Sequence, residues 1–213
     1  MKKISIVDYG LGNIFSVKQA FEFCNKGKNK VAVTSLHSEI ETSDFLVLPG
    51  VGAFKNAMHE IETRNLTEAI HNFALSGRPL LGICLGMQIL ASESNEFGNH
   101  KGLNLIPGKV SGIGDKNKDG STRKVPVIGW KNIYLSQSIH KSSILSSHQS
   151  NPFYLVHSYH FTPLQAEHVI ATYSHGDSNI IAAVQKDNII GCQFHPEKSG
   201  PNGLDIINRF LHL

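Results

Sequence analysis

One cysteine stands where a reactive side chain would be expected. Cys84 follows the apolar run 79–83, and glycines flank it at positions 82 and 86. A strand that gives way to Gly-x-Cys-x-Gly and then to helix-forming residues has the layout of a nucleophile elbow, a strained turn above the end of a sheet. A thiol at the start of a helix is also favoured as the thiolate. The spacing therefore predicts a nucleophile at Cys84, with a small buried apolar side chain as the alternative.

A histidine and a carboxylate follow the last predicted strand. His195 and Glu197 flank a proline in Gln-Phe-His-Pro-Glu-Lys-Ser, and the proline can turn the chain so that the two side chains face each other. His195 could then serve as a base for Cys84, while Glu197 holds the imidazole tautomer. A structural histidine is the alternative. Zinc would lack its other ligands, since the Pro-Cys-x-x-Cys of zinc deaminases is missing, and we expect neither a metal nor another cofactor.

Two glycine-rich turns could bind a negatively charged group. In Pro-Gly-Val-Gly-Ala-Phe, residues 49–54, two glycines let backbone N–H groups face outwards towards a developing oxyanion. An ordinary turn between a strand and a helix is the alternative. The second turn has glycines at 10 and 12, but Phe15 stands where a dinucleotide-binding fingerprint needs its third glycine. The nucleotide site is therefore set aside, and the turn at 49–54 stays open between an oxyanion site and an ordinary turn.

Alternating strands and helices must position these residues. The apolar pattern predicts strands at 4–8, 31–34, 44–48 and 79–83, and helices at 14–25, 38–42, 54–64, 66–76 and after Cys84. Strands that alternate with helices imply a parallel sheet. After Gly98 the pattern changes and predicts short strands at 103–106, 109–112, 125–128, 153–161, 169–173, 180–185 and 189–193, then a closing helix at 203–213. Residues 136–151 are rich in Ser, His and Gln, and we expect them to be exposed.

Composition limits the classes of function. The chain has 213 residues, enough for one well-filled core, and we expect a single domain over 1–213. With 20 Lys and Arg against 17 Asp and Glu, the net charge of +3 gives no electrostatic case for binding nucleic acid or a membrane. Cysteines at 24, 84 and 192 lack CxxC spacing, and no apolar leader follows Met1. We therefore expect a soluble, cytoplasmic protein.

Five segments, taken in order, resemble those of the class I glutamine amidotransferases. They are Asp-Tyr-Gly-Leu-Gly-Asn at 8–13, Leu-Pro-Gly-Val-Gly-Ala-Phe at 48–54, Gly-Ile-Cys-Leu-Gly-Met-Gln at 82–88, Val-His-Ser-Tyr at 156–159 and Gln-Phe-His-Pro-Glu-Lys-Ser at 193–199. The resemblance covers essentially the whole chain. It implies an α/β fold in three layers, with a mostly parallel central sheet and an additional antiparallel, β-rich C-terminal half.

The resemblance implies hydrolysis of the side-chain amide of glutamine to glutamate and ammonia. The Cys84 thiolate would attack the carboxamide, His195 would protonate the departing ammonia, and water would cleave the glutamyl thioester. Glu197 would orient His195. The chain would then be an enzyme with a Cys-His-Glu triad, whereas a catalytically idle binding subunit stays open as an alternative.

The resemblance also assigns residues around the substrate. The backbone N–H of Leu85 and one from Val51 or Gly52 would form the oxyanion hole, which a peptide flip completes in the family. The positions that match the family's glutamine pocket are Gln88, Glu96 and the backbone of Ser158 and Tyr159. On their residue types alone, Gln88 and Glu96 would lie on a helix surface and Tyr159 in a sheet core.

A partner is implied as well. Within the family the chain is most similar to glutaminase subunits that pass ammonia to a (βα)8-barrel cyclase in histidine biosynthesis, forming imidazole glycerol phosphate and an aminoimidazole carboxamide ribotide. The heterodimer would contact the partner through Asn13, Lys124, Trp130 and Lys198, with a core anchor as the alternative for Trp130. We expect the isolated chain to be nearly inactive, because the oxyanion hole needs the partner.

One segment of this partner-facing region departs from the family pattern. Where the family usually has Lys-x-Pro-His-x-Gly-Trp-Asn, this chain has Lys-Val-Pro-Val-Ile-Gly-Trp-Lys, which places Val127 for the histidine and Lys131 for the asparagine. A paralogous glutaminase supplies ammonia for sugar amidation in surface-polysaccharide synthesis, and a changed interface would suit that use. The ammonia acceptor therefore has two candidates.

Overall fold

The structure is a computed structural model that describes residues 1–137 and 143–213. Its helices are α1 (Ile14–Asn25), α2 (His37–Glu41), α3 (Phe54–Thr63), α4 (Leu66–Leu75), α5 (Leu85–Gln88) and α6 (Gly200–Phe210), with short 3-10 turns η1 (Ala166–His168) and η2 (Pro196–Lys198). The strands are β1 (Lys3–Val7), β2 (Lys30–Thr34), β3 (Phe45–Leu48), β4 (Leu80–Ile83), β5 (Glu93–Ser94), β6 (His100–Lys101), β7 (Gly108–Gly112), β8 (Val127–Leu135), β9 (Pro152–His157), β10 (Tyr159–Pro163), β11 (Val169–His175), β12 (Ser178–Lys186) and β13 (Ile189–Cys192).

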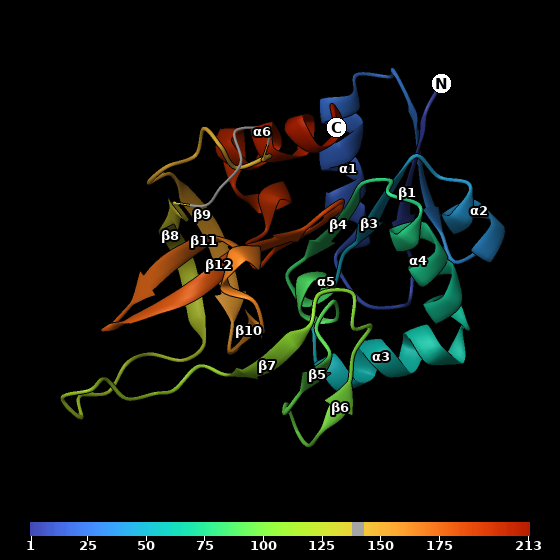
Figure 1. Cartoon of the computed structure of the whole chain (residues 1–213). Coiled ribbons are helices and arrows are strands. Elements are labelled where there is room, and N and C mark those ends of the chain that lie inside the picture. Colours follow the sequence, from blue (N-terminus) through green and yellow to red (C-terminus); the bar gives the residue numbers. More distant parts are fainter. Residues whose placement is uncertain (138–142) are drawn as a thin grey trace.

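A nine-stranded sheet in the order β2-β1-β3-β4-β13-β12-β11-β8-β9 runs through the molecule (Figure 1). Its strands are parallel from β2 to β13 and antiparallel from β13 to β9. A smaller sheet, β10-β7-β5-β6, lies beside it. The parallel N-terminal half and the antiparallel C-terminal half that the sequence predicts are thus continuous in one sheet, joined where β13 pairs with β4.

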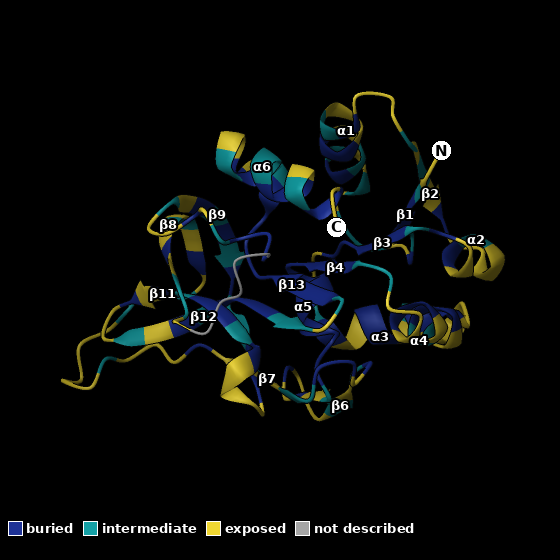
Figure 2. Ribbon diagram, turned by 45° about the horizontal axis from the view of Figure 1, so that its top comes forward, coloured by how far each residue is buried: buried dark blue, intermediate teal, exposed yellow. Residues whose placement is uncertain are grey.

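Helices cover both faces of the parallel half. Along β3 the side chains alternate, because Phe45 and Val47 pack with α1 and α6 whereas Leu46 and Leu48 pack with α3 and α4. This period of two, with both directions apolar, is what a strand buried on both faces requires. The helices turn their buried sides towards the sheet and their exposed sides outwards (Figure 2). The arrangement is the three-layer α/β fold that the sequence predicts.

The structure corrects several predicted elements. Residues 103–106 form no strand; the backbone N–H groups of Leu103 and Leu105 donate instead to the carbonyls of Ile89 and Leu90, at 2.8 and 2.9 Å. A buried loop and a buried strand have the same apolar composition, so the sequence could not separate them. The helix after Cys84 is only the four residues of α5, and the closing helix lies three residues earlier than predicted.

Other corrections concern the second half of the chain. The predicted strand 125–128 begins at Val127 and extends to Leu135, and the predicted strand 153–161 is two strands that meet at Ser158. At that point the chain passes from the large sheet to the small one. The prediction that 136–151 is exposed is wrong for residues 143–145 and for His148, which are buried. Residues 138–142 of that segment lie outside the described residues.

Candidate active site

Cys84 lies in a strained turn between β4 and α5. Its backbone has φ of 55° and ψ of −110°, a conformation that costs a non-glycine residue of the order of 1–3 kcal/mol. A Cβ atom at Gly86 would lie 1.7 Å from the carbonyl oxygen of Leu48, and one at Gly82 would lie 2.6 Å from the carbonyl oxygen of Gly86. Only glycine therefore allows α5 to approach β3 and β4 this closely, as the Gly-x-Cys-x-Gly spacing predicted.

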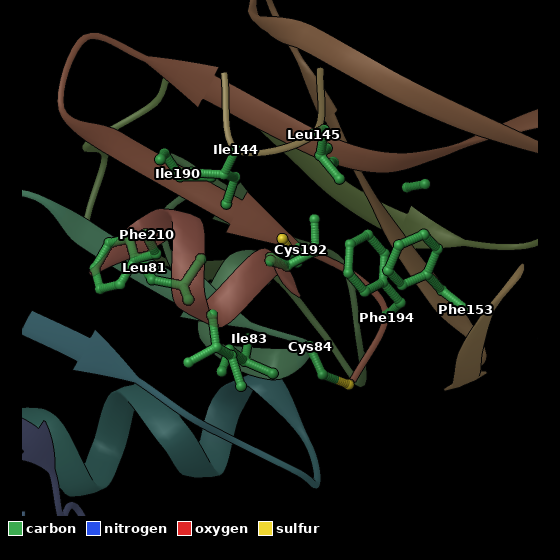
Figure 3. Close-up of a cluster of buried hydrophobic side chains, with 14 of the residues drawn as sticks. Leu81, Ile83, Cys84, Ile144, Leu145, Phe153, Ile190, Cys192, Phe194 and Phe210 are labelled. Carbon is green, nitrogen blue, oxygen red and sulfur yellow. The ribbon is translucent and has the colours of Figure 1, made fainter. Parts of the chain in front are cut away.

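The cysteine stands at the edge of a buried apolar cluster. Figure 3 shows Ile83, Cys192 and Phe194 in this cluster, with Cys84 at its border. The side chain of Cys84 is 6% exposed, and its backbone N–H donates to the carbonyl of Cys192 at 2.7 Å. The continued pairing of β4 with β13 thus brings the elbow beside the segment that carries His195.

His195 and Glu197 face each other after β13. Their side chains are 2% and 1% exposed, and Nδ1 of His195 lies 2.8 Å from Oε1 of Glu197. The turn η2 begins at Pro196, takes the chain out of strand geometry and returns Glu197 towards the imidazole. The backbone of His195 is held as well, since its N–H donates to the carbonyl of Tyr154 at 2.9 Å and its own carbonyl accepts from Ser199 Oγ at 2.6 Å.

The charge state of His195 follows from this environment. Burial lowers the pKa of His195, but the interactions with Cys84 and Glu197 outweigh it and raise the pKa to about 9. The other ring nitrogen, Nε2, is buried and has no hydrogen-bond partner among the described residues. Cys84 is therefore near enough to affect the imidazole, although Sγ and Nε2 fall short of hydrogen-bond geometry. The arrangement favours the imidazolium form of His195.

The glycine-rich turn 49–54 is closed in this structure. The N–H of Leu85, which the family resemblance assigns to an oxyanion hole, donates to the carbonyl of Gly50 at 3.3 Å. The C=O of Gly50 and the N–H of Val51 belong to one trans peptide and point in opposite directions. Because the C=O points at Leu85, the N–H of Val51 points away from it. Gly52 has φ of +114°, which favours glycine there. The N–H of Leu85 is thus occupied by the same turn that was expected to supply the second donor of the oxyanion hole, the N–H of Val51 or Gly52.

A pocket of about 340 Å³ opens beside Cys84. It is bounded by α5, the glycine-rich turn and the junction of β9 and β10, and its lining residues are Val51, Gly52, Cys84, Leu85, Gln88, Glu96, Phe97, Val156, His157, Ser158 and Tyr159. The structure therefore brings every predicted oxyanion and substrate residue to one cavity with the predicted nucleophile. The sequence did not single out Phe97, Val156 or His157.

Glu96 and Gln88 are both held by hydrogen bonds. Oε2 of Glu96 accepts from the backbone N–H of Phe54 at 2.7 Å, at the start of α3. Gln88 donates through Nε2 to the carbonyl of Tyr159 at 2.9 Å and to Oε1 of Gln193 at 3.0 Å. Glu96 and Gln88 are 8% and 5% exposed, so neither lies on a helix surface. Oε1 of Glu96 and Oε1 of Gln88 take no part in these bonds, which leaves both atoms for a ligand.

Three buried residues near the site were given no role by the sequence. Gln193 donates through Nε2 to the sulfur of Cys84 at 3.7 Å. His157 contacts the carbonyl of Tyr159 through Nδ1 at 2.7 Å. The hydroxyl of Tyr9 donates to the carbonyl of Pro49, and burial together with Cys84 raises the pKa of Tyr9. Gln193, His157 and Tyr9 all lie inside the five segments that carry the resemblance, and that is the signal that could have identified them.

The predicted partner-facing residues are at the surface. Asn13, Lys124, Trp130 and Lys198 are exposed, with Trp130 at 54%, so Trp130 is not a core anchor. Its ring makes an edge contact with Tyr154 at 6.1 Å. Val127 departs from the expectation, since it is 2% exposed and belongs to the buried apolar cluster that also contains Ile133 and Phe153. Burial therefore explains an aliphatic side chain at position 127, which has almost no surface for contact with a partner.

Two observations bear on other classes of site. Within the described residues, no group of three or more His, Cys, Asp and Glu side chains is placed to hold a metal ion. Across the ranges 1–137 and 143–213, no helix has the length and apolar character needed to span a bilayer.

The sequence is similar to known proteins along its whole length. A family model described as "Glutamine amidotransferase class-I" matches residues 5–213. The chain is 43% identical over 220 residues to "Imidazole glycerol phosphate synthase subunit HisH 1" of Legionella pneumophila (strain Paris), covering 100% of both chains. It is 44% identical over 208 residues to "Imidazole glycerol phosphate synthase subunit HisH" of Syntrophotalea carbinolica, covering 97% of this chain and 98% of the relative.

Solved structures share the fold. "Structure of PurLQS from Thermotoga maritima" superposes with a TM-score of 0.69 at 18% identity, covering 100% of this chain and 99% of that one. "Crystal structure of glutamine amidotransferase" also gives a TM-score of 0.69, at 15% identity, covering 98% of this chain and 97% of that one. At these identities the likeness shows the fold alone, and it confirms the predicted fold class.

Proposed function

The chain belongs to the class I glutamine amidotransferase family, and from this premise we propose that it is the glutaminase subunit of an imidazole glycerol phosphate synthase. It hydrolyses glutamine to glutamate and ammonia and passes the ammonia to a (βα)8-barrel cyclase subunit in histidine biosynthesis. The full-length identity of 43% to a subunit with that name carries the proposal. The chain acts as one domain, and its three free cysteines fit a reducing compartment such as the cytoplasm.

The triad supplies the chemistry of amide hydrolysis. The Cys84 thiolate adds to the carboxamide carbon of glutamine, and the electron pair of the C=O bond moves onto oxygen. When the tetrahedral species collapses, the C–N bond breaks and His195 gives its Nε2 proton to the departing amine, which leaves as ammonia. Water, deprotonated by the now neutral His195, then cleaves the thioester and releases glutamate. Glu197 keeps the Nδ1 side of the ring oriented and stabilises the imidazolium form.

The substrate is held by groups on both sides of the pocket. The side chain of Gln88 and the backbone at Ser158 and Tyr159 enclose the carboxamide end. Glu96 presents its second carboxylate oxygen, Oε1, to the α-ammonium group of glutamine, because Oε2 is used by the N–H of Phe54. A carboxylate and an ammonium form a charge-assisted hydrogen bond. The pocket volume of about 340 Å³ suits an amino acid of this size.

The oxyanion hole is completed by rotation of one peptide. Rotating the peptide between Gly50 and Val51 removes the Gly50 carbonyl from Leu85 and puts the N–H of Val51 in its place. The N–H groups of Leu85 and Val51 then face the oxyanion together. Each donor of this kind is typically worth a factor of 10² to 10³ in kcat. From the bond between the Leu85 N–H and the Gly50 carbonyl we therefore expect a chain that is slow by itself and is activated by its partner.

The exposed residues near the site form the surface for the cyclase. Trp130 contacts Tyr154, whose carbonyl accepts from the backbone N–H of His195. Asn13 caps α1 by accepting from the N–H of Ser16 at 3.3 Å. A partner that covers Trp130 would thus be separated from His195 by Tyr154 alone. Exposed tryptophan is a common anchor at protein interfaces.

The test is glutamine turnover by the purified chain with and without a cyclase of the histidine pathway. We expect slow glutamate release by the chain alone, a rise of at least about 100-fold with the cyclase, and no release by Cys84→Ala. Turnover that the cyclase does not raise would count against the histidine pathway and favour the polysaccharide acceptor. Release that persists in Cys84→Ala would refute the nucleophile, and no release with any partner would indicate an idle subunit.

A further inference from the structure

Gln193 lies beside Cys84 because their strands pair. In the parallel register of β4 and β13, Cys192 is opposite Ile83, so the next residues along the two strands are Gln193 and Cys84. The backbone of Gln193 is fixed further by its N–H, which donates to the carbonyl of Ala182 on β12 at 2.8 Å. Its side chain is fully buried. An amide is thus held rigidly next to the sulfur that reacts.

The direction of this amide follows from a chain of hydrogen bonds. The carbonyl oxygen of Tyr159 can only accept, so Gln88 must point its NH2 group at it. The same NH2 group has a second hydrogen, which it donates to Oε1 of Gln193. Because Oε1 of Gln193 faces Gln88, its own NH2 group faces the sulfur of Cys84, at 3.7 Å. The orientation of both amides is therefore set by a backbone carbonyl.

A buried histidine and tyrosine support the same carbonyl. Nδ1 of His157 lies 2.7 Å from the Tyr159 oxygen, so Nδ1 carries the hydrogen, and Nε2 accepts from the hydroxyl of Tyr173 at 2.8 Å. Burial lowers the pKa of His157 to about 4, so the ring stays neutral and keeps this tautomer around neutral pH. The hydrogen bonds from Tyr173 to Cys84 consequently keep the same donors and acceptors around neutral pH.

We propose that Gln193 is a catalytic residue that donates a hydrogen bond to the Cys84 sulfur and stabilises the thiolate, with Gln88 as the positioning residue that aims it. The inference deepens the proposed function, on which it rests. A hydrogen bond to an ionised acceptor is stronger than one to a neutral acceptor, so the donor favours the thiolate over the thiol. The titratable groups that also face Cys84 are His195 after β13, with Glu197 behind it, and Tyr9 after β1.

The test measures the thiolate directly and needs neither glutamine nor a partner. The full chain is alkylated with iodoacetamide between pH 5 and 10, and mass spectrometry follows the Cys84 peptide apart from those of Cys24 and Cys192. In Gln193→Met, which keeps the length of the side chain and removes the donor, we expect the midpoint of the profile to rise by about one pH unit. Below both midpoints the rate should fall about tenfold.

Two further variants make the result specific. Gln193→Glu has nearly the same shape and puts a carboxylate beside the sulfur, so its midpoint should rise by about two pH units. Gln185→Met makes the same chemical change on β12, where the amide donates to the carbonyl of Asp187 and to no other group among the described residues, and its profile should match the wild type. Thermal unfolding of each variant identifies any that fails to fold.

The outcomes separate the two levels of the proposal. Equal profiles for wild type and folded Gln193→Met or Gln193→Glu, with rapid alkylation of Cys84 in each, overturn the role of Gln193 and leave the nucleophile in place. A wild-type Cys84 that is no more reactive than Cys24 at any pH overturns the nucleophile itself. A rise of the midpoint in both variants, with Gln185→Met unchanged, supports the donor.

Discussion

Replacement of Glu197 by glutamine tests how the triad controls His195. Glutamine has the same shape and can still accept from Nδ1, but it carries no charge. A hydrogen bond to a charged acceptor contributes about 1.5–3 kcal/mol and one to a neutral acceptor about 0.5–1.5 kcal/mol, so the change removes roughly 1–2 kcal/mol. At 1.36 kcal/mol for each pH unit, the pKa of His195 should fall from about 9 to about 8.

The assay is the pH dependence of kcat/KM for glutamate release in the presence of the cyclase. The active form pairs a Cys84 thiolate with a protonated His195, so activity is lost as the pH rises through the pKa of His195. We expect the alkaline limb at about pH 9 in the wild type and about one unit lower in Glu197→Gln, with kcat/KM about twofold lower at pH 8 and about tenfold lower at pH 10 and above.

A matched control exists at a second histidine and carboxylate. Nε2 of the buried His148 lies 2.9 Å from Oδ2 of Asp205 on α6, and Asp205→Asn removes the same kind of charge away from Cys84. Its pH profile should match the wild type. An alkaline limb that stays in place in Glu197→Gln, with the protein folded, would refute the assignment of that limb to His195 and its carboxylate.

Three further changes have expected outcomes. Gly86→Ala should lower the free energy of unfolding in urea by about 3 kcal/mol or more, since the new Cβ would meet the Leu48 carbonyl at 1.7 Å. Burial lowers the pKa of His157 from 6.5 to about 4, so its contribution to stability is present above pH 6.5 and is lost as the pH falls towards 4; unfolding measured at pH 7 and pH 5 should show a smaller pH dependence in His157→Gln. Trp130→Ala should weaken binding of the cyclase by about 2 kcal/mol in calorimetry and change the free energy of unfolding by less than about 0.5 kcal/mol, as its side chain is largely exposed.

Much of the fold could be predicted where local signals are strong. The helix 14–25 was predicted with its observed bounds, because Asn13 caps it and its apolar residues repeat on one face. The segment 103–106 shows the limit, because its apolar residues belong to a loop whose backbone N–H groups donate to the carbonyls of Ile89 and Leu90. The order of strands also carries no local signal, so nothing in the sequence pattern says that β13 pairs with β4.

The pairing of β13 with β4 brings the residues of the site together, and it explains which of them the sequence pattern did not identify. Cys84 and His195 each have a recognisable local pattern, and they lie near each other because the two strands end together. Gln193 lies inside the segment 193–199 that carries the resemblance, but a glutamine at a strand end indicates no role by its residue type until its neighbour Cys84 is known. The bond from Leu85 to the Gly50 carbonyl depends on one peptide orientation, which residue types do not determine because glycine permits both.

The most direct test of the account is to find the acyl group on Cys84. The chain is mixed with the cyclase and glutamine, quenched in acid during turnover, and digested for mass spectrometry. We predict a glutamyl thioester on the peptide that contains Cys84 and none in Cys84→Ala. Glutamate release without that adduct, or with the glutamyl group on another residue, would contradict the assignment of Cys84 as the nucleophile.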